Sequence, residues 1–144
     1  MQDQNFKNHV RAVALYHFVL LTVVLAVDIL AIIHLISAFR HDRGILTAFI
    51  FVLTAIALSI ISILIRTFPL VAQDRAIRAE ENLRYFVLTG KLLNSGLSIQ
   101  QIIALRFAPD NEFVLLADRA VKEKLSNGDI KRAIRQWKAD HHRV

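Results

Sequence analysis

Hydrophobic residues are concentrated in two long runs in the first half of the chain. The second run, residues 45–65, contains no charged residue and is as long as the roughly 20 residues that an α-helix needs to cross a bilayer. The first run, residues 13–39, is separated from it only by residues 40–44. The pattern predicts two transmembrane helices joined by a short loop into a hairpin.

Small residues are expected to hold the two transmembrane helices together, because helices associate in lipid through close packing of small side chains. Thr22 and Ala26 share one face of the first helix, and Ala55, Ser59 and Ser62 share one face of the second. We expect these two faces to meet.

The second half of the chain has the spacing of amphipathic helices. Pro69 is expected to end or kink the second transmembrane helix. Beyond it, apolar residues recur at spacings of four and three, which predicts a helix over residues 70–92 with a narrow apolar seam of the coiled-coil type. Glycines at 90 and 96 should end this helix. The seam consists of Ala72, Ala76, Ala79, Leu83 and Phe86.

Three shorter helices are predicted after the seam helix. Ser98 and Gln101 have the spacing of a capping box that opens the first of them. Pro109 precedes the second, and Ser126 opens a third that is expected to reach Trp137. Helices this short are marginal in water, so we expect them to pack on one another and on the seam helix as a small bundle.

These patterns together predict an all-α fold, with an integral membrane helical hairpin followed by a small cytoplasmic helical bundle. The expected parts are a cytoplasmic N-terminal segment (residues 1–12), the hairpin (13–66) and a cytoplasmic helical domain (67–144). Hydrophobic residues make up 55% of the chain, but most of them lie in the hairpin, so the average describes neither half. Cysteine is absent, which excludes disulfides and zinc–thiolate sites.

Basic residues flank the two hydrophobic runs unevenly, and this sets the expected orientation. The positive-inside rule places the more basic flanks in the cytoplasm. Only Arg40 and Arg43 lie between the runs. We therefore expect a two-pass protein of the inner (plasma) membrane with both termini in the cytoplasm. The basic residues on the outer flanks of the two runs are Lys7, Arg11, Arg66, Arg75, Arg78 and Arg84.

Asp28 and His34 lie within the first predicted transmembrane helix, where ionisable side chains are costly and indicate a function. Ser59 lies at a similar depth on the second helix and is placed to donate a hydrogen bond to Asp28. Two interpretations stay open: a proton or ion relay through Asp28 and His34, or a hydrogen-bonded Asp28 that seats the helices or binds another subunit. The spacing of six residues puts Asp28 and His34 on different helix faces, which favours the second.

A polar cluster is expected at the cytoplasmic end of the hairpin, at the level of the lipid headgroups. Its aromatic members would anchor the helix at the interface. The ligand spacing of a metal site is absent from it. The expected members are His9, Arg11, Tyr16, His17, Arg66 and Asp74.

Catalytic motifs are missing from the sequence. We find no nucleophile–base pair, no glycine-rich phosphate loop and no paired carboxylates in an apolar setting. The net charge of +6 is spread over mixed-sign segments without a nucleic-acid reader motif. We therefore expect no enzyme, cofactor, metal, nucleic acid or small-molecule substrate.

The leading functional hypothesis is a non-enzymatic structural or interaction protein, either a homo-oligomer or an accessory subunit of a larger membrane complex. It would contact the lipid bilayer and take a protein partner, or a second copy of itself, on the seam. The alternative hypothesis is a small proton or ion transporter, or a channel-forming protein, that uses Asp28 and His34.

Several short sequence blocks, spread along the whole chain, form a distinctive combination. They are QNFKNH at 4–9, YHF at 16–18, RTF at 66–68, QDR at 73–75, IR at 77–78, IALRFA at 103–108, IKRAIRQW at 130–137 and RV at 143–144. The combination resembles an uncharacterised family of small bacterial membrane proteins. The resemblance implies a two-span inner-membrane protein and carries no assigned activity.

Overall fold

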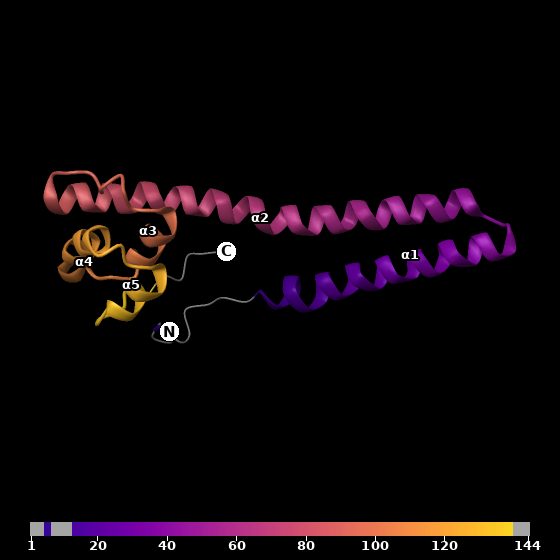
Figure 1. Ribbon diagram of the computed structural model, residues 1–144, viewed down its shortest axis with the longest axis horizontal. Helices are drawn as coiled ribbons and strands as arrows, with labels where there is room; N and C mark the ends of the chain where they lie inside the picture. The colour runs from indigo at the N-terminus through magenta and orange to yellow at the C-terminus, as the bar shows by residue number, and fades with distance from the viewer. Residues whose placement is uncertain (1–4, 7–12, 140–144) are drawn as a thin grey trace. The chain divides into compact units, whose positions relative to one another are not determined.

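The structure, a computed structural model, describes residues 5–6 and 13–139 of the chain (Figure 1). Within these residues every regular element is helical, which confirms the predicted all-α fold. Two of the helices are long and apolar enough to cross a membrane, by length and composition. The elements are a π-helical turn η1 (Leu15–Leu20), α1 (Leu21–His41), α2 (Ile45–Thr89), α3 (Ile99–Leu105), α4 (Asp110–Lys122) and α5 (Asn127–Ala133).

The chain forms two compact units, which we describe separately. One unit contains the described residues 13–68, with η1, α1 and the first part of α2. The other combines residues 5–6 with residues 69–139, and so contains the rest of α2 and the three short helices.

In the 13–68 unit, α1 and the first part of α2 run side by side in opposite directions (Figure 1). Helix α1 continues to His41, so the connection is shorter than the predicted loop of residues 40–44. Asp42 and Gly44 both have a positive φ, of 50° and 69°, and this left-handed backbone reverses the chain within three residues.

Small side chains fill the contact between α1 and α2, as expected for helices that approach closely. The prediction that the first helix contacts the second through Thr22 and Ala26 is wrong, because both residues are exposed. The carboxyl group of Asp28 bonds to α2, and this turns the face that holds Asp28 and Ala31 inward. The buried small residues of this contact are Ala31, Ala38, Ala48, Ala55 and Ser62.

Helix α2 continues through Pro69 and ends at Thr89, so of the two expected effects of Pro69, an end or a kink of the helix, the first is wrong. A proline removes one backbone hydrogen bond, but its φ suits a helix, and α2 keeps its helical backbone on both sides of Pro69. The helix ends where Gly90 adopts a φ of 71°, a conformation that only glycine takes without strain. The N–H of Gly90 still bonds to the carbonyl of Phe86 at 2.7 Å, which closes the last turn.

Helices α3, α4 and α5 pack together in the 69–139 unit around one apolar core. The side chain of Gln101 forms the predicted capping box with Ser98, and its Nε2 also donates to the carbonyl of Leu125 at 2.8 Å. The Oγ of Ser126 accepts from the N–H of Asp129 at the start of α5, as predicted. The largest fully buried side chains are Phe107, Phe113, Ile102, Leu105 and Ile130.

The last predicted helix is too long, because α5 ends at Ala133 and Ile134 is extended. Tertiary contacts take over the backbone there. The carboxylate of Glu112 accepts hydrogen bonds from the N–H groups of Arg135 and Gln136, at 2.9 and 3.1 Å. The extended chain then lays Trp137 against Phe107, with ring centroids 5.0 Å apart.

Candidate functional site

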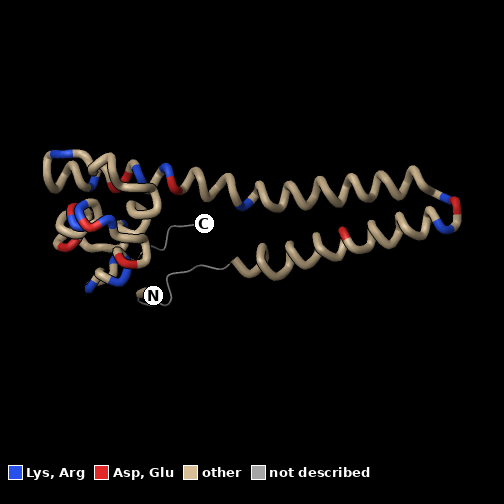
Figure 2. Tube along the Cα trace, in the orientation of Figure 1, with Lys and Arg blue, Asp and Glu red and all other residues tan. Residues whose placement is uncertain are grey.

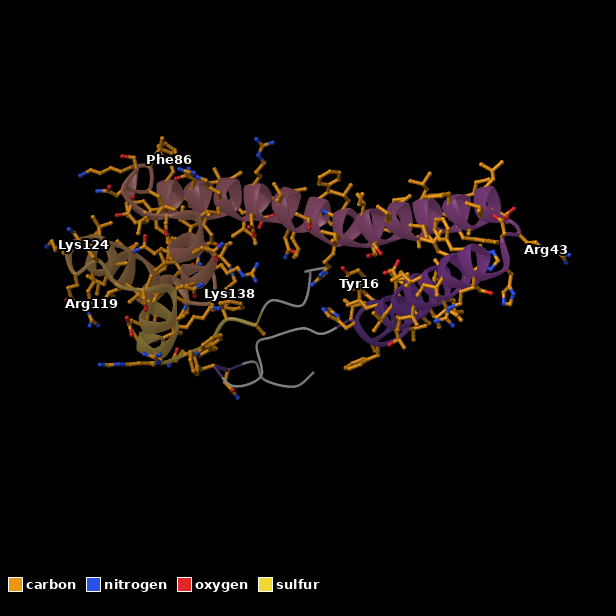
Figure 3. All side chains as sticks on the ribbon, turned by 45° about the vertical axis from the view of Figure 1, so that its right-hand side comes forward. Tyr16, Arg43, Phe86, Arg119, Lys124 and Lys138 are labelled. Carbon is orange, nitrogen blue, oxygen red and sulfur yellow. The ribbon has the colours of Figure 1, made fainter. Side chains whose placement is uncertain are left out.

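The seam on α2 is exposed along its whole length. Ala72, Ala76 and Ala79 are exposed, and the larger side chains of Leu83 and Phe86 are 64% and 50% exposed. Phe86 projects from α2 on the side away from α3, α4 and α5 (Figure 3). The described residues of the 69–139 unit therefore leave this apolar helix face open.

The opposite face of α2 carries the bundle. Ile77, Glu81 and Tyr85, spaced by four residues, are buried against it. The hydroxyl of Tyr85 donates to Oδ1 of Asp118 at 3.0 Å, and its ring meets Phe113 edge-on at 5.9 Å. The two faces of α2 thus differ: the face with Ile77, Glu81 and Tyr85 packs against the bundle, and the seam is apolar and exposed.

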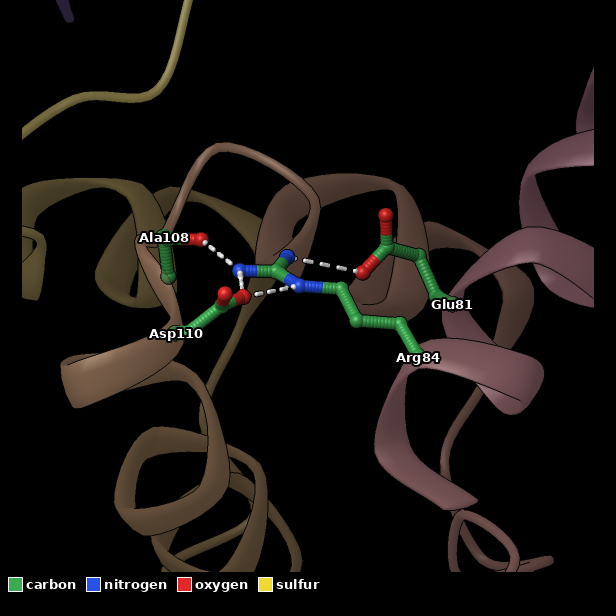
Figure 4. Close-up of polar contacts among 4 residues, drawn as sticks. All are labelled: Glu81, Arg84, Ala108 and Asp110. Carbon is green, nitrogen blue, oxygen red and sulfur yellow. Dashed lines mark hydrogen bonds and ion pairs between the residues drawn. The ribbon is translucent and has the colours of Figure 1, made fainter. Parts of the chain in front are cut away.

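Arg84 joins α2 to the segment before α4 and to the first residue of α4 (Figure 4). Its Nε donates to Oδ1 of Asp110 at 2.7 Å, and its Nη2 donates to the carbonyl of Ala108 at 2.7 Å. Its Nη1 lies 3.0 Å from Oε2 of Glu81. The guanidinium also lies over the ring of Phe113, 4.2 Å from the centroid. These contacts fix the angle at which α4 starts against α2.

Glu81 is buried beside this guanidinium. Burial raises the pKa of its carboxyl group above the ordinary 4.5, although Arg84 acts to lower it. Such a buried pair is a modest source of stability as a whole, but the loss of one partner is costly.

In the 13–68 unit, the hydroxyl of Ser59 donates a hydrogen bond of 2.9 Å to Oδ2 of Asp28. The structure thus brings these two predicted residues into contact. Both are half-buried between α1 and α2. The contact can hold the helices in register, because it joins a single acceptor on α1 to a single donor on α2.

His34 lies apart from this contact. Its ring is exposed on α1 and meets Phe51 edge-on, with centroids 5.4 Å apart. It borders an open pocket of about 250 Å³ whose other lining residues are apolar apart from one threonine. Asp28 and Ser59 are not among the lining residues, so the two predicted ionisable residues do not share a site. The lining consists of Val27, Leu30, Ala31, His34, Phe51 and Thr54.

The predicted polar cluster is only partly described, because His9 and Arg11 lie outside the described residues. The hydroxyl of Tyr16 donates to the carbonyl of Ser62 at 2.9 Å, which ties η1 to α2. The ring of His17 meets that of Tyr16 edge-on at 5.0 Å, and its Nδ1 lies 2.9 Å from the carbonyl of Val13.

Two further members of the predicted cluster lie in different units. Arg66 is in the 13–68 unit, where its side chain forms no hydrogen bond or ion pair with any described residue, and Asp74 is in the 69–139 unit. Groups of three or more metal-ligating side chains are also absent from the described part of the chain.

The sequence did not reveal the contacts of Arg84 with Glu81, Asp110 and the carbonyl of Ala108. The spacing of four residues between Glu80 and Arg84 predicts an ion pair on the helix surface. Asp110, directly after Pro109, is predicted to be a residue at the start of a helix. In the structure Arg84 pairs with Glu81 instead of Glu80. Asp110 is the first residue of α4, as predicted, and it also pairs with Arg84. An arginine on the face of α2 opposite the seam, in register with Ile77, is the feature that could have indicated an inward-facing cation.

Charged residues are distributed very differently in the two units. They are sparse along α1 and the first part of α2, and both signs are interspersed in the 69–139 unit (Figure 2). The first unit therefore presents an apolar exterior, and the second presents a surface typical of proteins in water.

Comparisons with known proteins give one match. A family model described as a family of unknown function, DUF6526, matches residues 1–144. No curated protein and no solved structure matches the chain.

Proposed function

This chain belongs to DUF6526, a family of unknown function, and we propose that it is a small membrane-anchored interaction protein without catalytic activity. In this proposal α1 and the first part of α2 cross the inner membrane of a bacterium as a hairpin. The 69–139 unit lies in the cytoplasm and presents the seam on α2 to a protein partner.

The apolar exterior of the 13–68 unit supports the membrane anchor. Its leucine, isoleucine and phenylalanine side chains are mostly exposed along both helices, whereas the core helix of a water-soluble protein is mostly buried. Exposed apolar surface on this scale is stable in lipid and prone to aggregation in water. Asp28 has its hydrogen-bond partner in Ser59, as intramembrane polar groups usually do.

Residues from before and after the hairpin belong to one unit, which supports their placement on the same side of the membrane. Phe6 lies against Arg132, with the guanidinium 5.6 Å from the ring centroid, so residues from before and after the hairpin meet in one unit. Two crossings return the chain to the side on which it began. With the excess of basic residues on the outer flanks of the two runs, this favours the cytoplasmic side.

The observation that carries the interaction role is the open seam. A helix face with Leu83 and Phe86 half or more exposed, on a helix whose opposite face packs against the bundle, is the geometry that binds a partner helix. The described residues offer no nucleophile–base pair or metal-ligand group that would support an enzyme instead.

Extraction and accessibility measurements test this proposal. We expect the protein to remain in the membrane fraction after alkaline carbonate washing and to dissolve only in detergent. In right-side-out spheroplasts, an external protease should leave residues 69–139 intact, and it should digest them after lysis. Release into the aqueous fraction, or digestion of these residues in sealed cells, would contradict the proposal.

Substituting Asp28 separates the interaction role from the alternative of proton or ion transport. Asn at position 28 keeps an acceptor for Ser59, so we expect D28N to insert and to unfold in detergent within about 1 kcal/mol of the wild type. D28L removes the acceptor and should be destabilised by more. If proteoliposomes of the wild type conducted protons and D28N abolished the flux, transport through Asp28 would be the better account.

A further inference from the structure

We infer that the partner of the seam is a second copy of this chain, bound in parallel through a two-stranded coiled coil. This inference rests on the proposed function, because it takes the seam as the interaction surface and the hairpin as the anchor. It adds the identity of the partner, its direction and its register.

The seam fits the heptad pattern of a coiled coil with the bundle on the outside. Its residues fall alternately at the d and a positions, beginning with Ala72 at d and ending with Phe86 at d. The buried residues of the opposite face, Ile77, Glu81 and Tyr85, then fall at b, f and c. Those are the positions that face away from the partner in a two-stranded coiled coil. The bundle and a second copy can therefore bind α2 at the same time.

The charges beside the seam are complementary to those of a second copy. Arg75 falls at a g position and Glu80 at the following e position, and both are exposed. In a parallel coiled coil, a residue at g lies beside the next e residue of the other helix. Arg75 of each copy would therefore meet Glu80 of the other, giving two equivalent ion pairs. Neither residue forms an ion pair with the described residues of its own chain.

The membrane fixes the direction of the two helices. If α2 of every copy leaves the bilayer on the cytoplasmic side, the segments that bear the seam run the same way. A parallel pairing is then the one available to two copies in the same membrane. It is also the pairing that places Arg75, at g, beside Glu80 of the other copy, at e.

The seam side chains are small at the N-terminal end of the seam and large at its C-terminal end. Ala72, Ala76 and Ala79 permit a close approach of the two backbones, and Leu83 and Phe86 fill the wider part of the interface. Val87, at the adjoining e position, is 75% exposed and would be covered as well. Covering this surface is the expected driving force, because apolar area removed from water stabilises association.

Cysteine cross-linking tests the pairing directly, because the native chain has no cysteine. A79C places a thiol at a d position, and R78C places one on the neighbouring, equally exposed residue at c. In native membranes with a mild oxidant, we expect at least about tenfold more disulfide-linked dimer from A79C than from R78C, because a disulfide needs the two Cα atoms within about 7 Å. Equal yields from the two variants, or no dimer from A79C, would overturn the inference.

A charge exchange tests the register. R75E and E80R each oppose like charges across the interface, and each should weaken dimerisation in detergent by about fivefold, as expected for two solvent-exposed pairs. The double variant R75E/E80R restores both pairs in reverse and should recover the wild-type affinity. A double variant as weak as the two single variants combined would overturn the proposed register. Fluorescence of the single tryptophan, Trp137, checks that each variant is folded.

The cysteine cross-linking, combined with carbonate extraction, distinguishes a failure of the self-association proposal from a failure of the proposed function. An A79C adduct to a different polypeptide, in a protein that resists carbonate extraction, would overturn self-association and leave the interaction role intact. A chain that is released from the membrane by carbonate would remove the proposed function itself.

Discussion

Replacing Phe113 by alanine is expected to destabilise the 69–139 unit by about 3–5 kcal/mol, the usual cost of truncating a buried phenylalanine. Phe113 is fully buried, and its ring contacts Tyr85 on α2 as well as the guanidinium of Arg84. The substitution leaves a cavity and removes both ring contacts. Denaturant unfolding of the full-length protein in detergent, followed by Trp137 fluorescence, measures the change.

Leu115 provides the matched control on the same helix. Its side chain is 74% exposed, so L115A should change the free energy of unfolding by less than about 0.5 kcal/mol. Equal destabilisation by F113A and L115A would contradict the core assigned to α4.

Replacing Arg84 by alanine is expected to cost about 3–5 kcal/mol, because it leaves the buried carboxylate of Glu81 without its partner. The same change removes the donors to Asp110 and to the carbonyl of Ala108. Both charged side chains of the Arg84–Glu81 pair are well buried, at 13% and 9% exposure, so solvent screens this pair little. Unfolding followed by Trp137 fluorescence is again the measurement.

Two further variants isolate the cause of this effect. R78A removes an exposed arginine from the same helix and should have little effect on stability. The double variant E81Q/R84A removes the unpaired charge and should recover a part of the stability lost in R84A. If R84A alone unfolded like the wild type, the Arg84 contacts would not contribute to joining α2 and α4.

The helices were predictable where local rules decide them. The capping box of Ser98 and Gln101 marks the start of α3, and Gly90 marks the end of α2. The seam was also visible from spacing alone, because two heptads of apolar residues stand out against charged neighbours. In each case the information lies within a few residues of the feature.

Features that depend on distant residues were not predictable. The end of α5 is set by Glu112, more than twenty residues earlier, which accepts from two backbone N–H groups. The hydrogen bond from Ser59 to Asp28 was predicted, but the helix face that it turns inward was not, because the small residues Thr22 and Ala26 pointed to a different face. Arg84 bonds to Asp110 rather than to Glu80, because the fold brings the start of α4 beside α2. A single sequence does not contain the spatial proximity that selects these partners.

Phe6 contacts Arg132, so the 13–68 unit is an insertion within the unit formed by residues 5–6 and 69–139. That unit is assembled from residues on both sides of the hairpin, so on the ribosome the contact of Phe6 with Arg132 forms only after the whole hairpin has been translated. A reporter protein fused ahead of residue 5 would consequently be brought next to helix α5. For labelling, the exposed turn at Lys124, between α4 and α5, is the more neutral place.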